Sequence, residues 1–554
     1  MNKVTREQVR SSAAWAAYGD AIGFITELAD SQKAVYHRAG VKRVETTIEW
    51  KRRIGGVSGA TVNLPAGAYS DDTQLRLSTG RCIRSGGDFD IESFAKVELP
   101  IWSNYALGAG RGTKVAVAHL TNRDVNWFSN NYSKKGIDYI HGGGNGAAMR
   151  IQPHVWACSD LVKKKYLIDV FKNSITTHGH ARGFLGSIFH AETLAYVLVN
   201  KSIPGPDEWL AFFESFRCIP DLVNQDPSLK AFWLPSWEGK VGSCLSDAID
   251  EVVKECIDDY DLVASIISLN KEDSYHKCLV AIGGMEPSTR GSGIKTALLA
   301  AVHAWVYRST TNPEQALAEA ANILQSDTDT IATMSGALLG AKGLEFPNGK
   351  VQDLEYIISE ADRCYDISIN RSTTNFDYPD LFTWTPPKTL VDIVSGESGS
   401  PELKGLGMGI AISETYLGKG EHSSIWQWVQ LPFGQTVLAK MRPLWAFEIY
   451  RPLPVKVRQI TEDVKNTASS TDNKPPAFKP PQVKSTVELH KLNIDQMSDF
   501  VIQHGFDEKL IGRCILELST RELGVESAIA FAGIIVKAKG VRARRKPSDL
   551  STLI

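Results

Sequence analysis

The sequence predicts a mostly helical protein that carries a small β-containing unit and a C-terminal helical domain. Three observations lead to this fold class. Capping residues repeatedly precede runs with helical apolar spacing over residues 1–345. Two short runs flank Pro432-Phe433-Gly434-Gln435 as the strands of a hairpin would, which places β structure within residues 346–458. After a Ser-, Thr-, Lys- and Pro-rich segment at 459–485, interpreted as a disordered linker, helical spacing returns over 486–554.

The composition narrows the class of protein. With 554 residues the chain is longer than one ordinary domain, so two or three units are expected. A net charge of −2 gives no argument for bulk binding to nucleic acid or to a membrane surface. The eight cysteines form no CxxC pair, and the polar start of the chain lacks an apolar signal core. No stretch is long enough to span a bilayer, and we expect a cytoplasmic protein without membrane association.

The first predicted helix begins at Thr5-Arg6-Glu7-Gln8, which reads as a capping box. It continues through small residues that would let neighbouring helices approach closely. Asp20 and Glu27 stand seven residues apart, so they fall near one face of this helix, two turns from each other. Acids in so apolar a helix need partners. The alternative is that Asp20 caps a neighbouring helix while Glu27 reaches solvent.

Two further helix starts are unusually acidic. Ser70-Asp71-Asp72-Thr73 precedes one apolar-periodic run, and Ser326-Asp327-Thr328-Asp329-Thr330 precedes another. One side chain can cap the free N–H groups of a helix start, which leaves the others facing outward. In the second string, alternate spacing predicts an extended loop with Asp327 and Asp329 on the same side. The alternative is that both strings are ordinary solvated caps.

Together the two acidic strings suggest a single shared site. Four carboxylates cannot crowd together without cations, because like charges raise their pKa values. Hard divalent cations that prefer oxygen ligands, Mg²⁺ or Mn²⁺, would neutralise this repulsion between the carboxylates.

A glycine-rich loop lies between the acidic strings. His141-Gly142-Gly143-Gly144-Asn145-Gly146 is expected to open directly into a helix that carries Met149 and Val155. Glycines allow close backbone approach, and helix N-termini offer N–H groups to phosphate. The loop is neither a Walker A loop nor a dinucleotide fingerprint, and a plain tight turn is the alternative. Farther on, His178 precedes a helix and could orient a ligand, or could be structural.

In order and spacing, these motifs resemble the ADP-ribosylglycohydrolase family, which includes the enzyme that reactivates dinitrogenase reductase. The resemblance covers about residues 5–345. It is carried by the motifs already described together with Gly19-Asp20-Ala21-x-Gly23-x-x-x-Glu27, Asn145-Gly146-Ala147-Ala148-Met149-Arg150, Thr177-His178 and Gly291-Ser292-Gly293.

The resemblance implies an all-α fold with two Mg²⁺ or Mn²⁺ ions in a central cleft. It implies hydrolysis of the glycosidic bond between C1″ of ADP-ribose and an acceptor. The implied metal ligands are Ser70, Asp71, Asp72, Asp327, Asp329 and Thr330. The implied catalytic residues are Glu27, Asp72 and Asp327, with Glu27 a metal ligand or general base. The implied substrate-binding residues, along the diphosphate and the ribose, are Gly144, Asn145, Gly146, Ala147 and His178.

The sequence departs from the family pattern before the second acidic string. Relatives usually carry Gly-Gly there, whereas this chain has Gln325-Ser326. Gln325 adds bulk where the loop must be tight. Ser70 often appears as Thr in relatives, a change that preserves the hydroxyl group.

The last third of the chain contains no catalytic pattern. A basic run near its end is either a solvated tail or a surface for an acidic partner, and it comprises Lys537, Lys539, Arg542, Arg544, Arg545 and Lys546. No aromatic platform accompanies this run, so nucleic-acid recognition is not supported. We expect this third to select the substrate protein or another protein partner.

The sequence therefore predicts a metal-dependent hydrolase that removes ADP-ribose from modified protein side chains. Arginine is the acceptor most frequent in the family. The alternative is an ADP-ribose-binding or toxin-neutralising immunity or defence protein with little turnover. A pure binder would not need four metal carboxylates, which favours the hydrolase.

Overall fold

The structure, a computed structural model, describes residues 4–269, 273–388, 394–395, 401–419, 424–442, 489–521 and 524–544. The chain divides into two compact units, Met1–Met441 and Arg442–Ile554. Among the residues that the structure describes, both units are mainly helical and the small sheets lie in the first, as the sequence predicts. Within the described residues, no helix combines the length and the apolar character that a membrane crossing requires.

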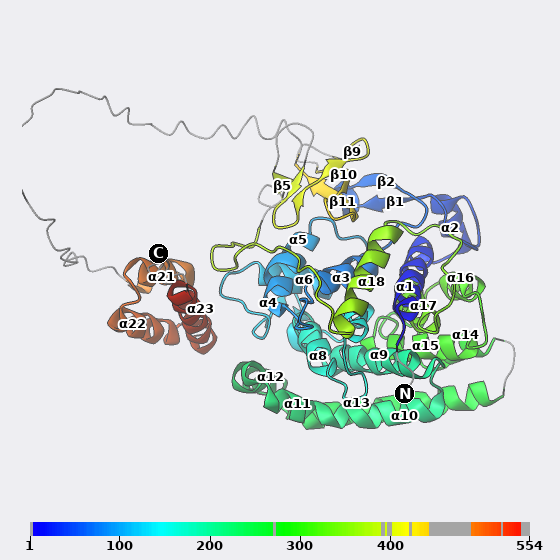
Figure 1. The fold of residues 1–554 in the computed structure, drawn as a ribbon, viewed down its shortest axis with the longest axis horizontal. Helices are drawn as coiled ribbons and strands as arrows, with labels where there is room; N and C mark the ends of the chain where they lie inside the picture. The colour runs from blue at the N-terminus through cyan, green and yellow to red at the C-terminus, as the bar shows by residue number, and fades with distance from the viewer. Residues whose placement is uncertain are drawn as a thin grey trace, which may run out of the picture. The chain divides into compact units, whose positions relative to one another are not determined.

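Two helices that start far apart in the sequence form the centre of the first unit. α1 (Arg6–Thr26) runs beside α17 (Thr328–Gly340) (Figure 1). The predicted capping box begins α1, with the Thr5 side chain accepting from the N–H of Gln8. A Cβ atom at Gly19 would overlap the carbonyl oxygen of Ala332, so the two backbones touch there. Small residues therefore bring α1 and α17 together, as expected.

The remaining helices of the first unit surround this pair. α15 (Gly293–Val306) packs against both α17 and α9 (Ala181–Asn200). The others of five or more residues are α2 (Gln32–Ala39), α3 (Asp71–Arg81), α6 (Arg111–Leu120), α7 (Gln152–Trp156), α8 (Leu167–Ile175), α10 (Pro206–Ser215), α11 (Ile219–Gln225), α12 (Leu234–Val241), α13 (Leu245–Ser268), α14 (Ser274–Ala281), α16 (Glu314–Asn322) and α18 (Leu354–Ser368). The short ones are α4 (Ile91–Ser93) and α5 (Leu99–Trp102).

One hairpin lies between α2 and α3, where no strand was predicted. β1 (Trp50–Ile54) pairs antiparallel with β2 (Ala60–Leu64) across a glycine-rich turn. The Trp428 indole donates to the carbonyl oxygen of Asn63 at 3.1 Å, so this early hairpin packs against strands near residue 430 (Figure 1).

The predicted hairpin about Pro432-Phe433-Gly434-Gln435 is present. β10 (Ile425–Gln430) pairs antiparallel with β11 (Thr436–Met441), with Val429 opposite Val437. β8 (Ile410–Ala411) and β9 (Tyr416–Leu417) pair with β10 on its other side. β5 (Val394–Ser395), β6 (Glu402–Leu403) and β7 (Gly407–Met408) form a separate small sheet.

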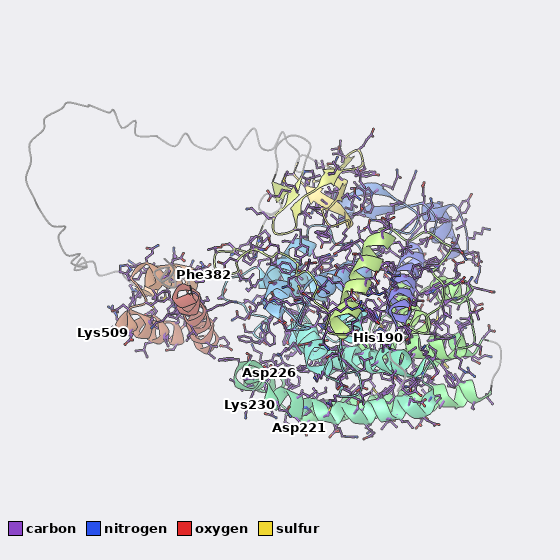
Figure 2. The ribbon with its side chains drawn as sticks, in the orientation of Figure 1. His190, Asp221, Asp226, Lys230, Phe382 and Lys509 are labelled. Atoms are coloured by element: carbon purple, nitrogen blue, oxygen red, sulfur yellow. The ribbon has the colours of Figure 1, made fainter. Side chains whose placement is uncertain are left out.

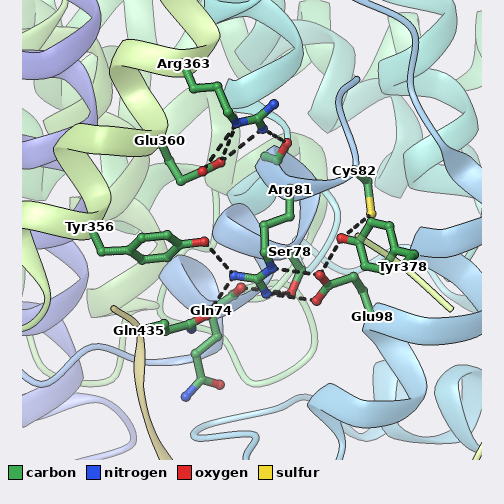
Figure 3. A network of polar contacts seen from close by, with 11 residues as sticks. Gln74, Ser78, Arg81, Cys82, Glu98, Tyr356, Glu360, Arg363, Tyr378 and Gln435 are labelled. Atoms are coloured by element: carbon green, nitrogen blue, oxygen red, sulfur yellow. Dashed lines mark hydrogen bonds and ion pairs between the residues drawn. The ribbon is translucent and has the colours of Figure 1, made fainter. Parts of the chain in front are cut away.

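A buried polar network joins this later region to α3 (Figure 3). Arg81, in the last turn of α3, forms an ion pair with Glu98 at 2.7 Å, and both side chains are almost fully buried. The Arg81 guanidinium also donates to the Tyr356 hydroxyl at 3.1 Å and to Gln435 Oε1 at 2.8 Å. The Tyr378 hydroxyl donates to Glu98 at 2.6 Å. Three side chains beyond residue 350 thus satisfy a charge pair at the end of α3.

The second unit contains α21 (Ile494–Gln503), α22 (Glu508–Ser519) and α23 (Gly524–Arg544). The predicted linker at 459–485 lies outside the described residues. Of the basic run, the stretch to Arg544 lies within helix α23, whereas Arg545 and Lys546 are outside the described residues.

Candidate active site

The first acidic string starts α3 and is capped twice. The Ser70 hydroxyl accepts from the N–H of Asp72 at 3.2 Å. The Asp20 carboxylate accepts from the N–H groups of Ser70 and Thr73, at 2.9 and 2.8 Å. Asp20 therefore caps a neighbouring helix, one of the two alternatives considered for it. Because Ser70 and Asp20 satisfy these N–H groups, Asp71 and Asp72 are left to face the cavity in front of the helix.

The second acidic string adopts a different backbone from the one expected. An extended loop through Asp329 was predicted, but α17 already begins at Thr328, and Asp329 lies in its first turn. Only Asp327 precedes the helix. The Thr330 hydroxyl donates to Asp72 Oδ2 at 3.4 Å, which connects the two acidic strings directly.

The two strings meet in one cavity of about 660 Å³. The site residues predicted from the sequence that line it are Glu27, Asp71, Asp72, Gly144, Asn145, Gly146, His178, Asp327, Asp329 and Thr330. Ser70 and Ala147 do not line it, because both are fully buried behind its wall. Glu27 also differs from the alternative considered for it, since its side chain is 14% exposed and faces the cavity instead of bulk solvent.

The glycine-rich loop forms another part of the cavity lining. Its backbone pairs with the start of α15, the Asn145 N–H donating to the carbonyl oxygen of Gly291 at 3.0 Å. The Asn145 side chain donates to Asp327 Oδ2 at 2.8 Å. The expectation that the loop opens directly into one helix was wrong. A 3₁₀ turn (Ala148–Arg150) comes first, and α7 follows with Pro153 in its first turn, where no N–H donor is needed.

His178 lies beneath the loop as a neutral side chain. Burial, with a smaller contribution from the nearby Arg150 charge, lowers its pKa to about 3. Its Nδ1 is 2.8 Å from the Thr177 hydroxyl. A Cβ atom at Gly146 would lie 3.2 Å from the imidazole, so a larger residue there would crowd the ring.

The carboxylates of the cavity are buried and lie close enough together to repel one another. Burial raises the pKa of Asp71 and Asp72 well above the ordinary value, and neighbouring acids raise both further. Burial followed by the charge of Glu27 raises the pKa of Asp329 in the same way. Burial also raises the pKa of Glu27, although Arg52 opposes that rise. Bound positive charge would relieve this crowding.

The donor set could hold hard divalent cations. Carboxylate and hydroxyl oxygens are the ligands that Mg²⁺ and Mn²⁺ prefer. Asp72 Oδ1 is buried and has no hydrogen-bond partner, because the Ser70 and Thr330 hydroxyls both donate to Oδ2. Nowhere in the described ranges, however, do three or more Asp, Glu, His or Cys side chains already stand in metal-binding geometry. The implied donors fit by chemistry, and all of them except Ser70 line the cavity.

Two residues that contact the carboxylates of the cavity were not found from the sequence. Arg52 lies on β1 and forms an ion pair with Glu27 at 2.7 Å. Gly108 has a φ of +88°, and a Cβ atom there would lie 2.8 Å from Asp71 Oδ1. The alternation in Trp50-Lys51-Arg52-Arg53-Ile54 is the signal that could have placed Arg52 on a half-buried strand.

Gln325 occupies the position where relatives carry glycine. Its φ is +76°, in the left-handed region that glycine adopts without strain. The sequence expectation of a tight backbone at this point is confirmed, and the glutamine side chain accepts an unfavourable conformation there.

The chain was compared with curated proteins, with solved structures and with protein-family models. No curated protein matches the chain. A solved ADP-ribosylglycohydrolase-related protein complex is similar in structure, with 19% sequence identity and a TM-score of 0.41, over 66% of this chain and 99% of that chain. The family model described as ADP-ribosylglycohydrolase matches residues 1–368, which runs from the start of the chain to the end of α18. That match spans well over half of the sequence and contains every residue of the acidic cavity, and the chain belongs to the ADP-ribosylglycohydrolase family.

Proposed function

We propose that the protein is a metal-dependent hydrolase that removes ADP-ribose from modified arginine side chains of proteins. The observation that carries the proposal is the meeting of two acidic helix starts and a glycine-rich loop in one cavity, joined by the hydrogen bond from Asn145 to Asp327. The loop suits a diphosphate, and the carboxylates suit cations beside a ribose.

Two Mg²⁺ or Mn²⁺ ions would be held by six oxygen donors of this cavity and its wall, Ser70, Asp71, Asp72, Asp327, Asp329 and Thr330. Bound there, such ions would polarise the ribose hydroxyl groups and lower the pKa of a nearby water molecule.

The residues of the chain have separate tasks in this proposal. Glu27 takes a proton from the water that attacks C1″, while the bond from C1″ to the acceptor nitrogen breaks. The released acceptor takes up a proton as it leaves. Gly144 and Gly146 give the diphosphate room to approach the backbone. The neutral imidazole ring of His178 packs against Gly146. Asn145 fixes the orientation of Asp327.

Arginine is proposed as the acceptor because the family most often acts on it, and a protein is proposed as the physiological substrate. We also propose that the protein works in the cytoplasm, where its eight free thiols would stay reduced.

The experiment measures release of ADP-ribose from an arginine-ADP-ribosylated protein in Mg²⁺ and in EDTA. The wild type should release ADP-ribose only with metal, and the Asp327→Ala plus Asp329→Ala variant should release none. A double variant of exposed acids, Asp221→Ala plus Asp258→Ala, should behave as the wild type.

If calorimetry shows that ADP-ribose binds but no ADP-ribose is released from arginine, serine or nucleic-acid linkages, the proposal of a hydrolase is wrong. The protein is then an ADP-ribose-binding protein. Release from a serine linkage alone would replace arginine as the acceptor.

A further inference from the structure

A second cavity lies next to the acidic one and has the opposite charge. Its volume is about 600 Å³. Its basic lining residues are Arg52, Arg53, Lys114, Lys388 and Lys440. Among the described residues that line it, none is Asp or Glu. Arg53, Lys114 and Lys388 are exposed, so solvent reaches these three basic side chains.

Two residues join this basic cavity to the candidate active site. Gly108 lines both cavities. Arg52 lines the basic cavity, and its guanidinium forms the 2.7 Å ion pair with Glu27 of the acidic one. The charge of Lys114 also acts on Asp71. Burial raises the pKa of the Asp71 carboxyl group, and the Lys114 charge lowers it. A group bound in the basic cavity would therefore lie beside the bond that is cleaved.

The aromatic residues of the basic cavity do not form a stacking platform. Phe24, Trp102 and Trp426 all line it, but each is at most 4% exposed. Trp426 also has the Lys440 ammonium over its ring, at 5.6 Å from the centroid. Binding of single-stranded nucleic acid depends on open aromatic faces for the bases, and these rings are not open. The chemistry available is therefore attraction of an anionic side chain rather than of a nucleobase.

We propose that the basic cavity binds an acidic or phosphorylated side chain of the target protein, close in sequence to the ADP-ribosylated residue. This inference rests on the proposed function and adds a substrate class to it. An ADP-ribosylated arginine keeps its positive guanidinium, which five basic side chains would repel. A neighbouring anion on the same target removes that repulsion and replaces it with attraction.

Arg52 gives this recognition a route to catalysis. An anion in the basic cavity would compete with the Glu27 carboxylate for the same guanidinium. Glu27 would then be freed from its ion pair when a matching target is bound. A target without an anion would leave the pair closed and Glu27 held by Arg52.

The test compares two peptides that carry the same ADP-ribosylarginine, one with flanking Glu and one with flanking Gln. The measurement is kcat/KM for each peptide in Mg²⁺. Exposed ion pairs contribute little singly, so we expect a preference of about three- to tenfold for the Glu peptide in the wild type. The preference should shrink as salt is raised, because the charges are near solvent.

The key variant is Lys114→Gln plus Lys388→Gln. It should lower the ratio of kcat/KM for the Glu peptide to kcat/KM for the Gln peptide towards one. Turnover of the Gln peptide by the same variant shows whether the active site is intact. The matched control is Lys230→Gln plus Lys509→Gln, two exposed lysines elsewhere (Figure 2), and it should keep the wild-type preference. Equal rates for the two peptides in the wild type, or an unchanged preference in the key variant, would overturn the inference.

Failure of the proposed function gives a different pattern. If neither peptide releases ADP-ribose, the proposed function is wrong. The basic cavity can then still be tested with the same variants, by measuring binding of the unmodified Glu peptide with fluorescence anisotropy. If an ADP-ribosylated single-stranded oligonucleotide reacts faster than the Glu peptide and loses that advantage in the key variant, the cavity binds nucleic acid and the protein assignment is overturned.

Discussion

Asn145 Nδ2 lies 2.8 Å from Asp327 Oδ2 and donates a hydrogen bond to it. The two residues are 182 positions apart in the chain. Asn145 belongs to the glycine-rich loop, which would face a diphosphate. Asp327 belongs to the second acidic string, which would face cations. The hydrogen bond between them therefore fixes these two parts of the cavity lining relative to each other. An amide that donates to a carboxylate in this way fixes the direction of the carboxylate.

Replacing Asn145 with Ala should lower kcat/KM for ADP-ribose release by roughly 10- to 100-fold, since hydrogen bonds to charged groups contribute about 1.5–3 kcal/mol. The control is Asn131→Ala, which removes a half-buried amide that donates to the Ser236 hydroxyl at 3.1 Å, since neither residue lines the cavity. An Asn145→Ala enzyme as fast as the control would show that Asp327 does not depend on this bond.

Glu27→Gln should reduce kcat by about 10²- to 10⁴-fold, the usual contribution of a general base, with a smaller effect on KM. Gln keeps the size of the side chain and removes the proton acceptor. The matched control is Glu45→Gln, because Glu45 also pairs with an arginine, Arg43, but at the surface. A Glu27→Gln protein with the kcat of the Glu45→Gln control would show that Glu27 does not take the proton from the attacking water.

Metal binding should be measurable without turnover. Asp329→Asn removes one charge from a group of crowded acids and retains an oxygen that can accept from the Thr330 N–H, as Asp329 does at 2.9 Å. In EDTA this variant should be more stable than the wild type, because the folded protein no longer holds that crowded charge. Mg²⁺ should raise the unfolding temperature of the wild type more than that of the variant. Asp221→Asn, at an exposed site (Figure 2), should change neither quantity. A variant that loses stability in EDTA would show that charge crowding is not significant.

Stability should decline in acid because of buried histidines. Burial lowers the pKa of His190 to about 3, and that of His154 likewise to about 3. In the unfolded chain a histidine takes up a proton near pH 6.5, whereas the buried one stays neutral, so stability falls as the pH decreases from about 6.5 towards 3.

Each such histidine adds up to about 1.4 kcal/mol per pH unit to this slope, and His190→Gln should remove its share. The free energy of unfolding, measured by urea titration from neutral to acid pH, checks this. His37→Gln, at an exposed position, should leave the slope unchanged. An unaltered slope in His190→Gln would mean that His190 is protonated in the folded protein.

Arg81→Met should destabilise the first unit by about 3–5 kcal/mol, because it leaves the buried Glu98 carboxylate without its counter-charge. The measurement is unfolding followed by tryptophan fluorescence. Adding Glu98→Leu to Arg81→Met should restore part of the loss. Arg217→Met, which breaks exposed pairs with Glu214 and Asp250, should stay near the wild type. Equal effects of the two methionine substitutions would show that the network contributes no more than a surface pair.

Local chemistry explains what could be predicted from the sequence. The capping box at Thr5 and the cap at Ser70 depend on residues within three positions, and both are present in the structure. The hairpin about Pro432-Phe433-Gly434-Gln435 likewise depends on a turn and its flanking strands. These elements need no distant partner to be recognised.

The unpredicted features depend on contacts between distant segments. The backbone at Asp327 is set by α17 packing against α1, so a two-residue alternation could not reveal that the helix starts at Thr328. Arg52 became a candidate site residue only when β1 placed it beside Glu27, 25 positions away. The sequence left two roles open for Asp20, and only the folded chain selects the cap on α3.

The network around Arg81 bears on how this enzyme can be shortened or recombined with relatives. The family match ends at residue 368, a natural place to cut the chain. A protein cut there would keep Tyr356 but lose Gln435 and Tyr378, two partners of the buried Arg81–Glu98 pair. That pair closes the same helix whose other end presents Asp71 and Asp72. For this chain, the smallest transferable catalytic unit therefore extends through the β10–β11 hairpin to residue 441.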